Sequence, residues 1–382
     1  MKRLCICGIG RVGYPMVQVF RSVGVEVIAY DIMATVAETT NPAYAVSKSD
    51  ACIFIVPTPS RKDGSFSNNI LINAITEIAN EVETQKKSNY LFIIASTVTP
   101  GSCTRQLLPL VKSKVSLPIS FAYKPEFIAL GQVEKDLRDP TFLLIGSDDG
   151  CGKEVEKIYR QITGNQVVAK HMNLIEAELA KIALNCAITM KISFANQIAM
   201  VAERFGANPF TILDLVGSDN RIGNQCLHPG LPFGGPCFPR DNKMFQYVAK
   251  SVSQLYNLSE ATDIINQTVR YQLLLKVAQL GQTIGILGLA YKVGVNITDE
   301  STGTYLRDML RHWGKVVYTH DVMADHEHSL EQVLSCPVIV IACPWKEYSM
   351  IDFANKIVIN PWGFYGGVVQ EASFKTRTVS RI

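Results

Sequence analysis

A glycine-rich turn presents one cysteine at the start of a predicted helix. The turn runs from Phe233 to Asp241 with the sequence FGGPCFPRD. Two adjacent glycines allow a tight turn and Pro239 suits a first helical turn, so Cys237 should lie at a helix N-terminus. The N–H groups and the dipole of that end favour the thiolate, which attacks carbonyl carbon. Asp241 follows about one turn later and can share the thiol's face. We therefore interpret Cys237 as a nucleophile, with a buried structural cysteine as the alternative.

A second set of polar side chains recurs along one predicted helix. Residues 173–204 lack Pro and Gly and keep a helical period, which predicts one long helix. Lys181 and Asn185 are one turn apart on a stripe that continues to Asn196. An ammonium and an amide in this arrangement can stabilise a developing oxyanion, whereas a solvated helix face is the alternative. The other faces of the helix are also apolar, so we expect a homodimer that forms through it.

The N-terminal segment carries a dinucleotide-binding pattern. A predicted strand, Lys2 to Cys7, leads into the motif GIGRVG, and a second strand, Val25 to Tyr30, ends at Asp31. The glycines allow a turn, an approach of pyrophosphate to a helix N-terminus, and close packing of helix and strand. A carboxylate after the second strand would bind ribose hydroxyls and repel a 2′-phosphate, which favours NAD. The predicted cofactor-binding residues of this segment are Gly8, Gly10, Arg11, Val12, Gly13 and Asp31.

Polar loops follow several further strands. We predict strands over Ala51–Val56, Tyr90–Ala95 and Thr141–Ile145. In open α/β sheets the loops after the strands' carboxyl ends bind ligands. This places Pro57, Thr58, Ser96 and Thr97 among the cofactor-binding candidates and makes Thr97 and Glu126 candidate active-site residues. For Thr97 and Glu126, a role as a capping or solvated loop residue is the alternative.

The rest of the chain predicts a second sheet. We expect a helix from Ser251 to Leu280, and then strands over Thr283–Leu287, Val316–Thr319, Cys336–Cys343 and Lys356–Ile359. The glycine turn at 288–290 resembles the turn after the first predicted strand but does not contain the motif GxGxxG. The predicted fold is α/β, with two Rossmann-like, doubly wound, parallel-sheet domains joined by a helical middle domain around one long central helix. We place an NAD-binding domain at 1–170, a helical domain at 171–280 and a second Rossmann-like domain at 281–382.

The length, charge and cysteine content of the chain limit the classes of protein to which it can belong. A chain of 382 residues exceeds the usual limit of one core, and a net charge of +3 without basic tracts argues against nucleic acid as a partner. Ten scattered cysteines indicate a reducing compartment, so we expect a cytoplasmic protein. Arg11 interrupts the apolar start too early for a signal peptide, and no apolar run nears the roughly 18 residues of a membrane span. Cys5 and Cys7 have no further Cys or His cluster nearby, so no metal is expected.

The chain resembles the UDP-glucose/GDP-mannose dehydrogenase family over nearly its whole length. The matching blocks are 8–13, 56–59, 96–98, 125–127, 176–196, 233–241 and 288–292. The resemblance implies oxidation of a nucleotide sugar's C6 alcohol to a carboxylate with two NAD in succession. It further implies that Cys237 captures the aldehyde as a thiohemiacetal, which is oxidised to a thioester and hydrolysed.

The resemblance also implies roles for individual residues. Lys181 and Asn185 would stabilise oxyanions, and Asp241 would assist proton transfer or position water. Thr97 would order water, and Glu126 would be a candidate base for hydrolysis. The third domain would hold the nucleotide. The substrate-contacting residues implied by the resemblance are Glu126, Phe127, Ile128, Lys181, Asn185, Arg221, Phe233, Gly234 and Lys292.

The chain departs from the family pattern at four places. They concern the face of the cofactor-binding domain, the hydrolysis step and the recognition of the substrate. A stretch that members commonly carry between Asp31 and Ala51 is missing. Leu130 replaces a second glutamate, Cys226 replaces a tyrosine, and Asp299 replaces an arginine. UDP-glucose is the default substrate, with a UDP-N-acetylhexosamine or GDP-mannose as alternatives. Other readings are a two-electron hydroxyacid dehydrogenase, which needs no cysteine, a non-catalytic nucleotide-sugar-binding protein, and a thiol redox sensor.

Overall fold

The computed structural model describes residues 2–254, 256–362 and 377–378, and the chain separates into two compact units, Met1–Ala183 and Leu184–Ile382. The long helix α7 (Leu174–Arg204) contributes residues to both units. It confirms the helix predicted from the pattern at 173–204. The three predicted domain limits stay a prediction.

The first unit is built on a seven-stranded sheet with the order β2-β1-β3-β4-β5-β6-β7. All its neighbouring strands are parallel except β5 and β6, which pair antiparallel. The strands are β1 (Leu4–Cys7), β2 (Val27–Tyr30), β3 (Ala51–Phe54), β4 (Tyr90–Ile94), β5 (Ile119–Tyr123), β6 (Phe142–Gly146) and β7 (Val168–Met172). The predicted strands all occur, whereas β5 and β7 were not predicted.

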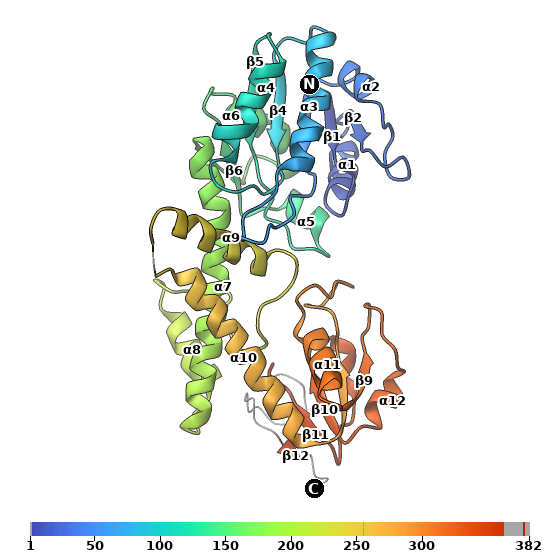
Figure 1. The fold of residues 1–382 in the computed structure, drawn as a ribbon, viewed down its shortest axis with the longest axis vertical. Coiled ribbons are helices and arrows are strands. Elements are labelled where there is room, and N and C mark those ends of the chain that lie inside the picture. The colour runs from blue at the N-terminus through green and yellow to red at the C-terminus, as the bar shows by residue number, and fades with distance from the viewer. Residues whose placement is uncertain (1, 255, 363–376, 379–382) are drawn as a thin grey trace. The chain divides into compact units, whose positions relative to one another are not determined.

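Helices cover both faces of this sheet (Figure 1). Side chains of β1 alternate between the two resulting cores, with Leu4 and Ile6 in one and Cys5 and Cys7 in the other. This alternation is the double winding that the apolar strands predict. The helices are α1 (Gly13–Ser22), α2 (Pro42–Ser47), α3 (Asn69–Thr84), η1 (Cys103–Leu107), α4 (Leu108–Lys114), α5 (Val133–Arg138) and α6 (Gly152–Thr163).

The second unit combines helices with a second sheet. Its five strands have the order β12-β11-β10-β8-β9 and are parallel except for β12. The strands are β8 (Thr283–Leu287), β9 (Val316–His320), β10 (Val338–Ile341), β11 (Ile357–Ile359) and β12 (Arg377–Thr378). The helices are α8 (Pro209–Ser218), α9 (Phe238–Ser251), α10 (Leu258–Leu280), α11 (Thr302–His312), α12 (Leu330–Leu334) and η2 (Lys346–Met350). The predicted fold class is therefore confirmed.

One predicted helix was wrong at its start. We expected a helix over Ser251–Leu280, but α9 ends at Ser251 and α10 begins only at Leu258. Asn257 caps α10, because its side chain accepts a hydrogen bond from the N–H of Glu260 at 2.8 Å. Ser253 has a φ of +62°, which a helix does not allow. A cap and a left-handed residue thus separate the two helices.

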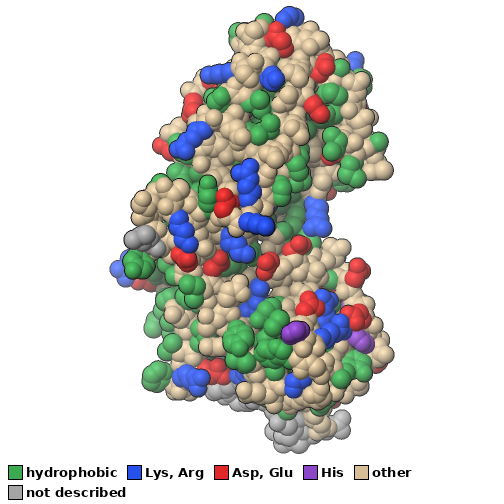
Figure 2. Space-filling view, in the orientation of Figure 1, with side chains coloured by type: hydrophobic (Ala, Val, Ile, Leu, Met, Phe, Trp, Pro, Cys, Tyr) green, Lys and Arg blue, Asp and Glu red, His purple; other side chains and the backbone are tan. Residues whose placement is uncertain are grey.

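Charged side chains of both signs are distributed over the surface seen in Figure 2, and the helices differ in length and apolar content. The face shown in Figure 2 has acidic and basic side chains interspersed, in keeping with a net charge of +3. Among the described residues, no helix combines the length and the apolar composition that a membrane crossing requires.

Candidate active site

The first glycine turn has the geometry that a dinucleotide needs. Gly8 has a φ of +102°, and a Cβ on Gly13 would lie 1.8 Å from the carbonyl oxygen of Gly8. These two positions therefore require glycine. A Cβ on Gly10 would meet nothing within 4 Å, so the space beside this residue is open to a ligand. Helix α1 begins at Gly13 without a side-chain cap, which leaves its first N–H groups available for an anion.

Asp31 lies beside this turn, as predicted. Its Oδ2 accepts a hydrogen bond from the N–H of Ile9 at 2.7 Å, and its Oδ1 accepts from the N–H of Met33 at 3.0 Å. The carboxylate is thus fixed at the end of β2, where a ribose would reach it. Arg11 and Val12 belong to the turn itself, and Arg11 is exposed. The residues present fit an NAD site.

The loops after β3 and β4 are joined to each other. Thr58 Oγ1 donates to the carbonyl oxygen of Thr97 at 2.6 Å, and Ser96 Oγ donates to that of Val56 at 2.7 Å. Pro57 is exposed beside them. The structure therefore brings together the four candidates that the sequence placed after these two strands.

Lys181 lies against the peptide after β5. Its Nζ donates to the main-chain oxygen of Glu126 at 2.8 Å and lies 4.4 Å from the centroid of the Phe127 ring. Only 6% of Lys181 is exposed, so its face is not a solvated one. Lys181 and the segment of Glu126 and Phe127, which the sequence named separately as site candidates, thus lie in contact. Ile128 follows in the same segment and packs against the core that contains Leu4 and Ile6.

A buried ion pair in this segment was not predicted from the sequence. Lys124 Nζ lies 2.5 Å from Glu126 Oε2, and the side chains are only 6% and 9% exposed. Tyr159 OH donates to Glu126 Oε1 at 2.9 Å. Burial lowers the pKa of Lys124, while the neighbouring Glu126 charge opposes this. Both carboxylate oxygens of Glu126 therefore have a donor, which favours a structural part for this side chain beside its predicted role as base.

Cys237 lies at the predicted helix N-terminus. It is the N-cap of α9, is exposed, and precedes Pro239 in the first turn. Burial lowers the pKa of Arg240, while the charges of Asp241 and Cys237 oppose this. Arg240 Nε lies 4.0 Å from Asp241 Oδ1. The helix N-terminus and the positive charge of Arg240, three residues further on, both favour the thiolate form of a cysteine.

Asp241 connects this helix to α7. Its Oδ2 accepts a hydrogen bond from Asn185 Nδ2 at 2.6 Å, and both side chains are buried. One turn further along α7, Thr189 Oγ1 donates to Oδ1 of Asn242, the residue after Asp241, at 3.1 Å. The predicted polar stripe of α7 therefore binds the helix that begins at Cys237. The hydrogen bond to Asp241 fixes the orientation of the Asn185 amide.

The cysteine turn packs against a loop of the second sheet. Gly235 N donates to the carbonyl oxygen of Asp299 at 2.9 Å. A Cβ on Gly235 would lie 2.5 Å from the ring of Tyr291, whose pKa burial raises to about 12, with smaller contributions from Cys237 and Asp299. Lys292 follows directly, with its Nζ 5.8 Å from the Tyr291 ring. Lys292 and the turn of Phe233 and Gly234 thus belong to the same compact unit, Leu184–Ile382.

Other predicted residues have different surroundings. Arg221 is 88% exposed and pairs with Asp219, 2.6 Å away, in a local surface contact. Leu130, at a position that departs from the family pattern, packs against the same core as Ile128. Cys226 is exposed with a φ of +60°. The other departing position, Asp299, meets the cysteine turn through its main chain.

Known proteins resemble this chain over most of its length. Residues 34–163 match the NAD binding domain of the UDP-glucose/GDP-mannose dehydrogenase family, and residues 175–268 match its central domain. The UDP-glucose 6-dehydrogenase AglM of Haloferax volcanii is 26% identical, with 91% of this chain and 93% of the relative covered. That of Rickettsia prowazekii is 29% identical, with 80% and 74% covered.

Two solved structures have the same fold throughout. A UDP-glucose dehydrogenase from Pyrobaculum islandicum superposes with a TM-score of 0.86 at 26% identity, covering 94% of each chain. A UDP-D-ManNAc dehydrogenase from Pyrococcus horikoshii gives a TM-score of 0.77 at 25% identity, covering 92% of this chain and 91% of its own.

Proposed function

Because the chain belongs to the UDP-glucose/GDP-mannose dehydrogenase family, we propose that it oxidises the C6 alcohol of a nucleotide sugar to a carboxylate through Cys237. It is a nucleotide-sugar dehydrogenase with NAD as its cofactor. The observation that carries the covalent step is the position of Cys237 as N-cap of α9, beside Arg240 and the buried Asp241.

The first unit would hold the cofactor. The first turn of α1 faces the space beside Gly10, which suits the pyrophosphate, and Asp31 suits the adenosine ribose. The joined loops at Thr58 and Thr97 would border the same end of the sheet. When bound, NAD accepts the hydride that leaves C6 in each oxidation.

The side chains would act in a defined order. Lys181 and Asn185 would stabilise the oxygen anion that develops at C6. The Cys237 thiolate would add to the aldehyde carbon, so that the aldehyde stays bound as a thiohemiacetal. After the second hydride has left, water would cleave the thioester and return the thiolate. Asp241 would take or position the proton of that water, with Thr97 ordering it, and Glu126 remains the candidate base.

The substrate is the finer part of the proposal. Two relatives named as UDP-glucose 6-dehydrogenases support UDP-glucose as first choice. The resemblance to a UDP-D-ManNAc dehydrogenase supports a UDP-N-acetylhexosamine as the alternative. GDP-mannose remains a third candidate. The exposed apolar side chains of α7, such as Phe194 and Val201, support a homodimer through this helix, and a cytoplasmic location stays a prediction.

A panel of nucleotide sugars with NAD or NADP tests the proposal. We expect two NADH per sugar and a uronate product by mass with one UDP-hexose, and little reaction with NADP. Cys237→Ser should lower the formation of carboxylate at least a hundredfold, because serine is a poor nucleophile without a base to activate it. Full turnover to the acid in Cys237→Ser would rule out covalent capture. One NADH per substrate would instead indicate a two-electron dehydrogenase.

A further inference from the structure

Arg270 is a buried cation whose partner belongs to a loop of the second sheet. It lies on α10 with 5% of its surface exposed. Its Nη2 donates to the main-chain oxygen of Glu300 at 2.9 Å, and its Nη1 donates to Glu300 Oε2 at 3.3 Å. The burial of a guanidinium is costly, and a partner side chain that is 48% exposed offsets only part of that cost. The shorter of its two contacts with Glu300 is the one with the main-chain oxygen.

That backbone is held in an unusual conformation. Glu300 has a φ of +50°, a left-handed conformation that residues other than glycine rarely adopt. The oxygen that accepts from Arg270 would lie 2.3 Å from a Cβ on Gly234. The neighbouring carbonyl of Asp299 accepts from Gly235 N at 2.9 Å. The main chain at 299–300 therefore lies between Arg270 and the turn that leads to Cys237.

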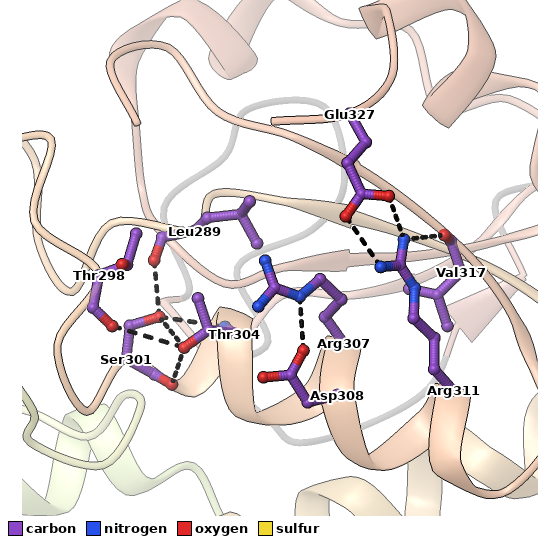
Figure 3. A network of polar contacts seen from close by, with 9 residues as sticks. All are labelled: Leu289, Thr298, Ser301, Thr304, Arg307, Asp308, Arg311, Val317 and Glu327. Atoms are coloured by element: carbon purple, nitrogen blue, oxygen red, sulfur yellow. Dashed lines mark hydrogen bonds and ion pairs between the residues drawn. The ribbon is translucent and has the colours of Figure 1, made fainter. Parts of the chain in front are cut away.

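Ser301 fixes the other end of this segment (Figure 3). Its Oγ donates to the carbonyl oxygen of Leu289 at 2.6 Å and accepts from the N–H of Thr304 at 3.1 Å. The first contact returns to the glycine turn after β8, and the second caps α11. Residues 299–301 are thus attached to the second sheet on one side and to the cysteine turn on the other.

Helix α10 also holds the cysteine turn directly, one helical turn before Arg270. Asn266 Oδ1 accepts from Phe233 N at 2.9 Å, and its Nδ2 donates to the oxygen of Phe233 at 3.0 Å. Asn266 and Arg270 share one face of the helix, because they are four residues apart. The turn is therefore held at Phe233 by Asn266, and at Gly234 and Gly235 it meets the main chain of Glu300 and Asp299.

We propose that Arg270 is a positioning residue for Cys237, acting through Glu300 and the Gly234–Gly235 turn. The proposal rests on the proposed function, in which Cys237 is the nucleophile. Cys237 begins α9 two residues after Gly235, so a displaced turn moves the thiol away from the helix N-terminus. Arg270 itself touches neither the sugar nor the cofactor in this scheme.

The test is the rate at which iodoacetamide alkylates Cys237 in the absence of substrate. Among the described cysteines, Cys226 is the other exposed one, so every variant is made in a Cys226→Ser parent, and peptide mapping confirms the labelled site. We expect Arg270→Met to react about tenfold more slowly at pH 7, with a raised pH midpoint, because the thiolate loses the helix N-terminus. Arg270→Lys should restore only part of the rate, since an ammonium lacks the two-pronged geometry.

Lys276→Met is the matched control on the same helix. It removes a half-buried ion pair with Glu203, 2.9 Å between Nζ and Oε1, and should leave the rate and the midpoint unchanged. If Arg270→Met does not fold, Glu300→Gly replaces it, because glycine suits the positive φ while the carboxylate is lost. We expect it to alkylate about threefold more slowly than the parent.

Parental rates and midpoints in both Arg270→Met and Glu300→Gly would overturn the proposal. A shift that Lys276→Met also produced would do the same, because it would show a general effect on α10. Since the assay contains no substrate, its result does not depend on turnover. Activity retained in Cys237→Ser would refute the nucleophile and leave the alkylation result standing.

Discussion

Two lysines hold the short segment after β5, each at a different atom of Glu126. Lys181 binds the main-chain oxygen, and Lys124 binds the carboxylate together with Tyr159. Because Lys181 is the proposed oxyanion donor, the position of this peptide bears on its orientation. The buried Lys124 and Glu126 side chains therefore fix a segment on which a functional side chain rests.

Replacement of Lys124 tests how strongly this pair holds the segment. Lys124→Met should lower the free energy of unfolding by about 3 kcal/mol, because it leaves a buried carboxylate without its cation. In the double variant Lys124→Met/Glu126→Gln, part of that loss should be recovered, since no buried charge remains. Urea unfolding followed by circular dichroism measures both.

A surface pair provides the control for this cycle. Lys86 pairs with Glu83 at 2.5 Å, with the lysine side chain 68% exposed. Lys86→Met should cost less than about 1 kcal/mol. Equal losses for Lys86→Met and Lys124→Met would contradict the buried pair, as would additive losses in the double variant.

Among the elements, α7 is joined to the loop after β4 by a buried carboxylate. Glu178 accepts from the N–H groups of Gly101 and Cys103 at 2.6 and 2.7 Å, and none of its surface is exposed. These N–H groups begin the helical segment that runs from η1 into α4. Glu178 thus caps one helix from another, and it fixes the loop that contains Thr97.

The ionisation of Glu178 should make stability depend on pH. Burial raises its pKa above the ordinary 4.5, although the two N–H groups oppose this. Between 4.5 and the raised value the folded state binds more protons than the unfolded state, so stability falls as the pH rises. Glu178→Gln removes this fall, because an amide does not titrate. It also leaves one N–H without an acceptor, which costs about 1–3 kcal/mol.

We therefore expect Glu178→Gln to be more destabilising near pH 5 than near pH 8. The measurement is the difference in melting temperature between parent and variant at both pH values. Glu176→Gln, at an exposed position of the same helix, is measured beside it for comparison. A difference that grows with pH for Glu178→Gln would contradict the assignment.

The elements that could be predicted are those whose signals are local. Apolar runs and glycines gave β1 and α1, and a long period without Pro or Gly gave α7. Strand β7 (VAKHM) is partly exposed at the edge of the sheet and carries no apolar run, so periodicity did not find it. The pairs Lys124 with Tyr159 and Arg270 with Glu300 depend on packing between segments far apart in the sequence. No local pattern could reveal them.

Across the whole molecule, the two sheets use the same glycine contact for different purposes. A Cβ on Gly303 would lie 2.2 Å from the carbonyl oxygen of Gly288, as one on Gly13 would lie 1.8 Å from that of Gly8. In the second sheet a long insertion separates the two glycines, which is why no GxGxxG motif is visible. That insertion carries the residues that meet the cysteine turn. Its end, Ser301, caps α11 with its own hydroxyl, whereas α1 has no side-chain cap.

This difference predicts one NADH site per chain, at the first turn. Gly10→Val should weaken NADH binding about a hundredfold, because the side chain enters the space required by the pyrophosphate. Its melting temperature should stay near that of the parent, since a Cβ at Gly10 meets nothing within 4 Å.

Ser301→Ala should behave in the opposite way. It removes a helix cap, which costs about 1 kcal/mol, and leaves both the NADH affinity and the ratio of one per chain unchanged. Titration by calorimetry with thermal melts of each variant distinguishes the two. A second NADH bound per chain, or a loss of NADH affinity in Ser301→Ala, would show that the second glycine turn also serves a dinucleotide.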